Sequence, residues 1–181
     1  MNTEDGSGIK RRTEKLLAMS KFADSLAELS VGKLRKVGVV IFNCECTEVL
    51  AMGYNGPPTG EDHEQCHDDP STPSGDLHAE VNALIKLRSR ETAVMCVTAS
   101  PCTLCAGYVA NVKQIRFLIF GPDKAPVGGM RRLAKHGVRV IDRASLEILA
   151  TFDTEAFKSL TSARMSHAVD FVRSVKLCQG S

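Results

Sequence analysis

Two stretches decide the fold of this chain: "LHAEVNALIKL", residues 77–87, and "SPCTLCAGYVANV", residues 100–112. The first has apolar residues at the spacing of an amphipathic helix, and the second carries a proline near its start, which is favoured in a first helical turn. Between them, "TAVMCVTAS", residues 92–100, is almost continuously apolar, as is typical of a strand buried on both faces. The sequence therefore predicts a helix, a strand and a second helix in succession.

The apolar pattern continues on both sides of this unit. The turn around "NCECT", residues 43–47, predicts a hairpin of two strands. The buried face of the helix in residues 77–87 is predicted to comprise Leu77, Val81, Leu84, Ile85 and Leu87. The remaining predicted elements are strands at 36–43, 47–55, 115–121 and 138–142, and helices at 13–29, at 130–137 and, as a pair, within 144–178.

This order of elements indicates an α/β fold with a central five-stranded mixed sheet between two layers of helices. The later strands should be parallel, because right-handed crossovers connect them. A length of 181 residues suits one domain over 1–181, with its core at about 37–141, an N-terminal helix at 13–29 and a C-terminal helical extension at 144–178.

The composition excludes several classes of protein. Charged residues nearly balance, with 23 Lys and Arg against 21 Asp and Glu, and the basic groups "KRR" and "KLRK" form no continuous stripe. This pattern weighs against a nucleic-acid polymer as substrate. The apolar runs are too short to cross a membrane and no apolar signal core follows the N-terminus, so we expect a cytoplasmic protein.

The cysteines suggest a metal site. Their number, seven, is odd, and without a secretory signal this favours thiols or metal ligands over disulfides. Cys102 and Cys105 are three apart at a helix start, so they share a face, and the helix dipole there favours thiolates. His78 can supply a third ligand and leave a fourth position for water, with Glu80 beside the metal as a base. Cys96 lies in an apolar run and reads as a small buried hydrophobe.

Each half of this pattern is weak when taken alone. A C-x-x-C pair could be a redox pair or half of a zinc finger, and a lone His78 is more often a core or capping residue. A structural zinc would need a fourth Cys or His. The conjunction of H-x-E at one helix start with P-C-x-x-C at another is instead the signature of zinc-dependent nucleobase deaminases.

Three stretches resemble the cytidine and deoxycytidylate deaminase superfamily: "VGVVIFNCECTEVLAMGYNGPPTG", "HAEVNALIKL" and "VTASPCTLCAGYVANVKQIRFLIFG". They run from about residue 37 to 141 in the order and spacing of that family. The G-Y-N-G-x-P-x-G segment at residues 53–60 resembles the dCMP deaminase branch more narrowly. The resemblance implies a cytidine-deaminase-like α/β/α fold.

The resemblance also implies an activity, which is hydrolytic deamination of dCMP to dUMP with release of ammonia. One catalytic Zn²⁺ would be held by His78, Cys102 and Cys105. Glu80 would take a proton from water and deliver it to the pyrimidine ring. Members of this branch are commonly homo-hexamers that dCTP activates and dTTP inhibits.

By the same resemblance Asn55 contacts the nucleoside, although Asn-Gly is also a strong turn signal by itself. The backbone of Ala79 and Pro101, together with Ser100, would line the base pocket. Many relatives have a bulkier apolar residue or Glu where Ser100 stands, which leaves the size of the pocket open.

The substrate's 5′-phosphate needs a cation, and we expect Lys36 to serve because it lies nearest the first strand of the hairpin. Lys33 and Arg35 are alternatives, and each of the three could instead be an exposed solubilising charge.

A second, structural zinc is conceivable in the loop "EDHEQCHDDPSTPSGD", residues 61–76, which carries His63, Cys66 and His67. Cys44 or Cys46 could complete such a set. The composition of the loop favours a polar loop without metal.

Three other functions stay open at this point. They are a tRNA or single-stranded nucleic-acid deaminase, a deaminase of a modified dCMP or of free (deoxy)cytidine, and an inactive zinc-binding module. The low aromatic content, 5% without Trp, weighs against the first, and the presence of Glu80 weighs against the last.

Overall fold

A computed structural model describes residues 6–32, 35–61, 75–121, 129, 132–133 and 135–144. The helices and strands in these ranges follow the predicted order. They are α1 (Gly6–Glu28), β1 (Gly38–Asn43), β2 (Val49–Tyr54), α2 (Ala79–Leu84), β3 (Ala93–Val97), α3 (Thr103–Asn111), β4 (Ile115–Phe120) and β5 (Arg139–Asp142). Within the predicted helix at 130–137, residues 132, 133 and 135 are helical. The predicted extension at 144–178 lies outside the described residues except for Ala144.

The sheet has five strands in the order β2-β1-β3-β4-β5. β1 pairs antiparallel with both β2 and β3, while β3 with β4 and β4 with β5 are parallel. The mixed sheet, the hairpin and the parallel later strands are therefore confirmed. All five residues of β3 are buried, as the unbroken apolar run predicts for a strand covered on both faces.

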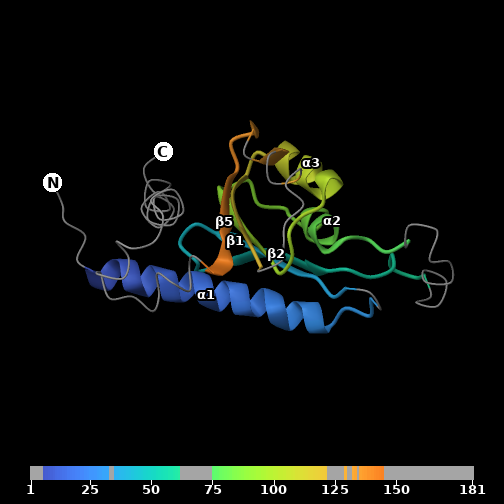
Figure 1. The fold of residues 1–181 in the computed structure, drawn as a ribbon, viewed down its shortest axis with the longest axis horizontal. Coiled ribbons are helices and arrows are strands. Elements are labelled where there is room, and N and C mark those ends of the chain that lie inside the picture. The colour runs from blue at the N-terminus through green and yellow to red at the C-terminus, as the bar shows by residue number, and fades with distance from the viewer. Residues whose placement is uncertain are drawn as a thin grey trace.

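Helices cover the sheet on its two faces (Figure 1), and alternation along the strands separates two core clusters. One cluster joins α1 to the sheet through Leu16, Ala23, Leu26, Val40, Phe42, Val94, Phe117 and Ile119. The other joins α2 and α3 to the opposite face through Val39, Ile41, Ala79, Ala83, Met95, Ala106, Val109 and Leu118. The chain is thus a three-layer α/β/α structure.

Helix boundaries differ from the prediction at two places. α1 begins at Gly6 rather than at residue 13, because the intervening segment is helical without showing apolar periodicity. α2 ends at Leu84, and the following N–H groups of Lys86 and Leu87 donate to carbonyls three residues earlier, which tightens the last turn. The predicted buried face is wrong for Ile85, which is 55% exposed, and the buried residues of α2 are Ala79, Glu80 and Ala83, while Val81 and Leu84 are half-buried.

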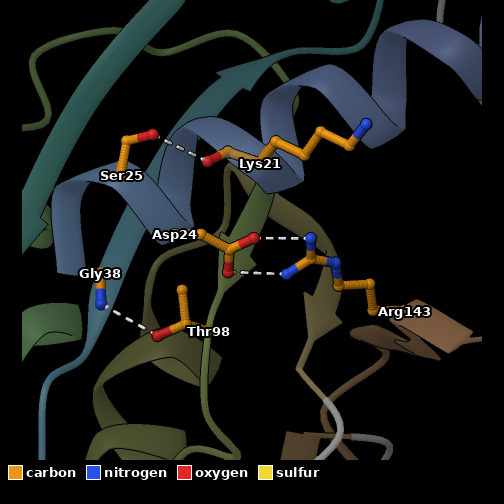
Figure 2. Close-up of polar contacts among 6 residues, drawn as sticks. All are labelled: Lys21, Asp24, Ser25, Gly38, Thr98 and Arg143. Carbon is orange, nitrogen blue, oxygen red and sulfur yellow. Dashed lines mark hydrogen bonds and ion pairs between the residues drawn. The ribbon is translucent and has the colours of Figure 1, made fainter. Parts of the chain in front are cut away.

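The helix α1 packs directly against the backbone of the sheet at Gly38, the first residue of β1. A Cβ atom built there would collide with the carbonyl oxygen of Ala23 and lie 2.6 Å from the nitrogen of Ala27. The Gly38 N–H donates to Thr98 Oγ1 over 3.0 Å (Figure 2). Only glycine permits this close approach of helix and strand.

An ion pair joins α1 to the residue that follows β5. Arg143 donates from Nη1 to Asp24 Oδ1 over 2.7 Å, and its Nη2 lies 2.6 Å from Oδ2 (Figure 2). This two-pronged ion pair fixes the end of β5 against α1, across 119 residues of sequence. Asp24 is 45% exposed, so the pair contributes about 1 kcal/mol or less.

No helix among the described residues is long and apolar enough to cross a bilayer.

We expect Gly38→Ala to lower the free energy of unfolding by about 3 kcal/mol, because the new methyl group must displace α1 or β1. Urea unfolding followed by circular dichroism measures this change. The matched control is Gly56→Ala, since a Cβ at Gly56 meets nothing within 4 Å. The control should stay within about 1 kcal/mol of the parent protein; equal losses in both variants would contradict the packing argument.

Candidate metal centre

The structure brings His78, Cys102 and Cys105 together. One ligand atom from each lies within 4.8 Å of the others. His78 Nδ1 is 3.3 Å from Cys105 Sγ and 3.7 Å from Cys102 Sγ. A single ion can therefore reach all three atoms, although they come from segments separated by a strand.

Both helix starts aim their side chains at this point. Cys102 is the N-cap of α3 with an extended backbone, and its sulfur accepts a hydrogen bond from the Cys105 N–H over 3.4 Å. His78 is the N-cap of α2, and its side chain makes no capping hydrogen bond, so the imidazole is left to face the thiols. The N-cap positions of two helices thus supply two of the three ligand groups, and a capping hydrogen bond holds one of them, Cys102.

The position of α2 depends on the hairpin strand β2. A Cβ at Gly53 would lie 2.6 Å from Ala83 N and 2.8 Å from Ala79 O, so the glycine lets α2 rest on the strand. Asn82 Nδ2 donates to the carbonyl of Tyr54 over 2.9 Å. The "GYN" stretch therefore has a structural role, because it positions α2, the helix whose N-cap is His78.

These donors suit zinc. One imidazole nitrogen and two thiolate sulfurs are the ligands of several catalytic zinc sites, which leave one position for water. Among the described residues no other His, Cys, Asp or Glu joins this group. The donor set thus fits a catalytic ion better than a structural zinc, which takes four protein ligands.

The electrostatics of the centre call for a cation. Burial, followed by the Glu80 carboxylate and Cys102, raises the pKa of the Cys105 thiol above its usual range. Burial by itself therefore favours the neutral form of the Cys105 thiol. The thiolate expected at this helix start stays a prediction. A divalent ion reverses the balance, since a coordinated thiol loses its proton.

Glu80 lies beside these ligands and is not one of them. It is only 4% exposed, and burial raises the pKa of its carboxyl group. Its backbone N–H, the charge of His78 and a hydrogen bond with the Cys105 thiol lower that pKa in part. A carboxyl group with a raised pKa can both accept and return protons near neutral pH.

The predicted base-pocket residues border the two helix starts. Ala79 and Pro101 are buried next to the ligands His78 and Cys102. Ser100 is 7% exposed, and its Oγ has no hydrogen-bond partner among the described residues. A buried hydroxyl without a partner is costly, and a ligand could satisfy it.

The side chain of Asn55 is engaged within the protein. Its Oδ1 accepts from Ser30 Oγ over 2.8 Å and from the Val37 N–H over 2.7 Å. Its Nδ2 donates to the carbonyl of Arg35 over 2.9 Å. Asn55 therefore holds the segment before β1 in place, whatever contact it also makes with a substrate.

That segment carries Arg35, whose positive charge lowers the pKa of Glu80. Arg35 and Lys36 are both exposed, and the charge of Arg35 has the weakest of these effects on the pKa of Glu80. Lys33 lies outside the described residues. The sequence offered no reason to rank Arg35 above its neighbours, because the ranking depends on the loop that Asn55 ties down.

Of the residues considered for a second zinc, His63, Cys66 and His67 lie outside the described residues. Cys44 and Cys46 are buried in the core cluster beneath α1, and burial raises the pKa of Cys46 to about 11. Cys96 belongs to the same cluster, as predicted for a small buried hydrophobe.

Sequence reasoning missed one residue near the ligands. Arg132 Nη1 donates to the carbonyl of Thr103 over 2.9 Å, directly after Cys102. No local signal marks Arg132, because its contact spans 29 residues of sequence.

Comparison with known proteins agrees with this geometry. Residues 11–121 match the family described as the cytidine and deoxycytidylate deaminase zinc-binding region. No curated protein matches the chain. Among solved structures, dCMP deaminase from the cyanophage S-TIM5 in complex with dCMP and dUMP is 29% identical, with a TM-score of 0.62. The match covers 71% of this chain and 96% of the phage protein.

Two further structures are similar. The apo form of the same phage enzyme is 28% identical, with a TM-score of 0.60 over 71% of this chain and 97% of the other. A diaminohydroxyphosphoribosylaminopyrimidine deaminase/5-amino-6-(5-phosphoribosylamino)uracil reductase from Thermotoga maritima is 20% identical, with a TM-score of 0.55. That match covers 87% of this chain and 42% of the other, and at this identity it supports the fold alone.

We expect Cys102→Ala to weaken zinc binding by more than about 100-fold, because loss of a ligand should exceed the 10–100-fold cost of losing an outer-shell partner. Elemental analysis after dialysis against a weak chelator measures the bound zinc. Cys96→Ala is the control, since Cys96 lies on the other face of the sheet. Full zinc content in Cys102→Ala would exclude this ligand set.

Proposed function

Because the chain belongs to the cytidine and deoxycytidylate deaminase family, we propose that it hydrolyses dCMP to dUMP and ammonia, supplying dUMP for thymidylate synthesis. The observation that carries this proposal is the buried Glu80 carboxyl group beside the His78, Cys102 and Cys105 cluster. The similarity to a phage dCMP deaminase over most of its length supports the choice of substrate.

The reaction exchanges one bond for another at C4 of the pyrimidine ring, where a C–O bond forms and the C–N bond breaks. Zinc held by the three ligands would supply Lewis acidity, which lowers the pKa of water toward neutrality. Glu80 accepts the proton that water loses and delivers it to N3. It then carries the proton of the new C4 hydroxyl group to the exocyclic amine, so that the C4 carbonyl forms as ammonia leaves.

Burial of Glu80 serves this cycle. A carboxylate in water would hold its proton too weakly to return it to the amine, and the raised pKa brings donor and acceptor closer in strength. Ala79, Ser100 and Pro101 border the same point and form the proposed wall of the base pocket. The unpartnered Ser100 hydroxyl is a ready hydrogen-bond group for the pyrimidine.

The phosphate of dCMP requires a cation near the centre. We infer that Arg35 serves rather than Lys36, because Asn55 binds the backbone of Arg35 directly. Asn55 fixes the backbone of Arg35 and in this way would set the distance between the phosphate site and the metal site. A direct contact of Asn55 with the sugar remains part of the proposal.

Assembly and regulation are proposed on family grounds only, as a cytoplasmic homo-hexamer that responds to dCTP and dTTP. The second candidate activity is deamination of a modified dCMP or of free deoxycytidine. The buried Ser100 hydroxyl is the observation that supports a modified base. A small hydroxyl group leaves room that a bulkier side chain would fill.

We expect Glu80→Gln to keep its zinc and to lose turnover of dCMP by about 10²–10⁴-fold, because the amide cannot carry the proton. Ammonia release and zinc content are measured on the same preparation. A variant that keeps both zinc and a large share of the activity would refute the role of Glu80.

We expect Arg35→Ala to raise KM for dCMP about tenfold or more while KM for deoxycytidine changes little, because only the nucleotide has a phosphate to lose. Lys36→Ala is the matched control, with the smaller effect on KM. A larger effect of Lys36→Ala would support the prediction from the sequence that Lys36 binds the 5′-phosphate.

The substrate is tested by ammonia release from dCMP, CMP, deoxycytidine, 5-substituted dCMP and single-stranded DNA. The proposal requires dCMP to have the highest kcat/KM of the panel. Preference for deoxycytidine or for DNA would replace it by one of the alternatives.

A further inference from the structure

The loop at residues 98–102 carries two groups of the candidate site, the Ser100 hydroxyl and the thiol of Cys102. Its first end is tied to β1 by two hydrogen bonds. The Thr98 N–H donates to the carbonyl of Gly38 over 3.0 Å, and Thr98 Oγ1 accepts from the Gly38 N–H over 3.0 Å. The direction of the Cys102 side chain therefore depends on what holds the other end of the loop, where α3 begins.

That other end is held from outside by the segment that contains Gly129 and Arg132. Both residues are helical, and they contact the backbone on either side of Cys102. A Cβ built on Gly129 would collide with the carbonyl oxygen of Pro101 and lie 3.4 Å from the carbonyl group of Cys102. Arg132 Nη1 donates to the carbonyl of Thr103 over 2.9 Å. We call these two contacts, of Gly129 with Pro101 and of Arg132 with Thr103, the outer clamp.

The side chain of Arg132 finds its place on α3 because residue 107 is a glycine. A Cβ at Gly107 would lie 2.9 Å from Arg132 Nη1 and 3.6 Å from its Cζ. Gly107 follows Thr103 by one turn inside the helix, where glycine is less favourable than alanine. A poor helix former thus stands at the point where the guanidinium rests on α3.

Stability alone explains the Arg132 contact poorly. Arg132 is exposed, so its hydrogen bond competes with water and contributes little. Holding a long side chain in one position also costs rotamer entropy, and the helix dipole opposes a cation beside the first turn. What the contact does fix is the backbone at Thr103, which lies between the ligands Cys102 and Cys105.

The outer clamp consists of contacts within one chain. They persist whether the outer side of α3 is open to solvent or covered by another subunit. The clamp is also separate from the ligand set, because glycine has no side chain and the guanidinium of arginine has no lone pair to offer a metal. Its effect on the centre must therefore pass through the backbone.

We propose that Arg132, together with Gly129, positions the zinc centre: the outer clamp fixes the backbone on both sides of Cys102 and so directs its sulfur toward the other two ligands. Loss of an outer-shell partner typically lowers metal affinity by about 10–100-fold. The inference rests on the zinc centre of the proposed function, and it is independent of which nucleotide is the substrate.

The test measures the zinc affinity of the full chain by competition with a chelator, so it needs no substrate. Arg132→Ala should bind zinc about tenfold more weakly than the parent protein, because the carbonyl of Thr103 is released. The matched control is Lys135→Ala, which removes an exposed cation from the same helical segment and should bind zinc like the parent protein.

Gly107→Ala tests the same contact from the side of α3. The three atoms nearest to the new methyl group all belong to Arg132, so the methyl group displaces a flexible side chain and leaves the backbone in place. Zinc affinity should again fall about tenfold. Thermal unfolding of the zinc-free variant should occur at the parent temperature or above it, because alanine favours the helix. A purely structural role of Arg132 would not separate these two measurements.

The double variant Gly107→Ala/Arg132→Ala decides whether both changes act on one contact. It should lose zinc affinity about tenfold, as each single variant does, and not the roughly 100-fold of independent effects. Co²⁺ in place of zinc adds a spectroscopic signature, since its visible absorption depends on the geometry of the thiolate ligands. That absorption should change in Arg132→Ala and in Gly107→Ala and stay the same in Lys135→Ala.

The proposal is overturned by any of four results. They are parent-like zinc affinity in Arg132→Ala, losses that multiply in the double variant, a lower unfolding temperature of zinc-free Gly107→Ala, and a changed oligomeric state of Arg132→Ala. The third would assign the loss to the fold, and the fourth would assign Arg132 to a contact between subunits. Because the readout is metal binding, failure of the clamp and failure of dCMP deamination are distinguishable.

Discussion

The approach of one imidazole to two thiols is the constraint on which the site depends. His78 Nδ1 lies 3.3 Å from the Cys105 sulfur, in surroundings that also bury the Glu80 carboxyl group. Burial raises the pKa of both Cys105 and Glu80. These groups can form a working centre only around a cation, because deprotonated thiols and a carboxylate at such distances repel one another.

The fold supplies that approach through contacts between backbones. Gly53 lets α2 rest on β2, and Gly38 lets α1 rest on β1 from the other face. With α2 set so close to β2, its N-terminal end, where His78 lies, is fixed relative to the sheet. The ligand geometry therefore depends on glycine positions that have no chemistry of their own. The Asp24–Arg143 ion pair adds a smaller tie at the end of β5.

The loop before β1 connects packing to the proposed phosphate site. The Asn55 amide holds this loop by accepting from the Val37 N–H and donating to the Arg35 carbonyl.

The sequence by itself determined the order of the elements, the mixed sheet and the candidate ligands, because apolar periodicity and the H-x-E and P-C-x-x-C spacings are local signals. It misplaced the end of α2 and the exposure of Ile85, since burial of a side chain is a property of the packed whole. Only the tertiary structure decided that Gly53 lets α2 rest on β2 and that the His78 imidazole meets the thiol of Cys105. These contacts join separate segments of the sequence, and only folding brings them together.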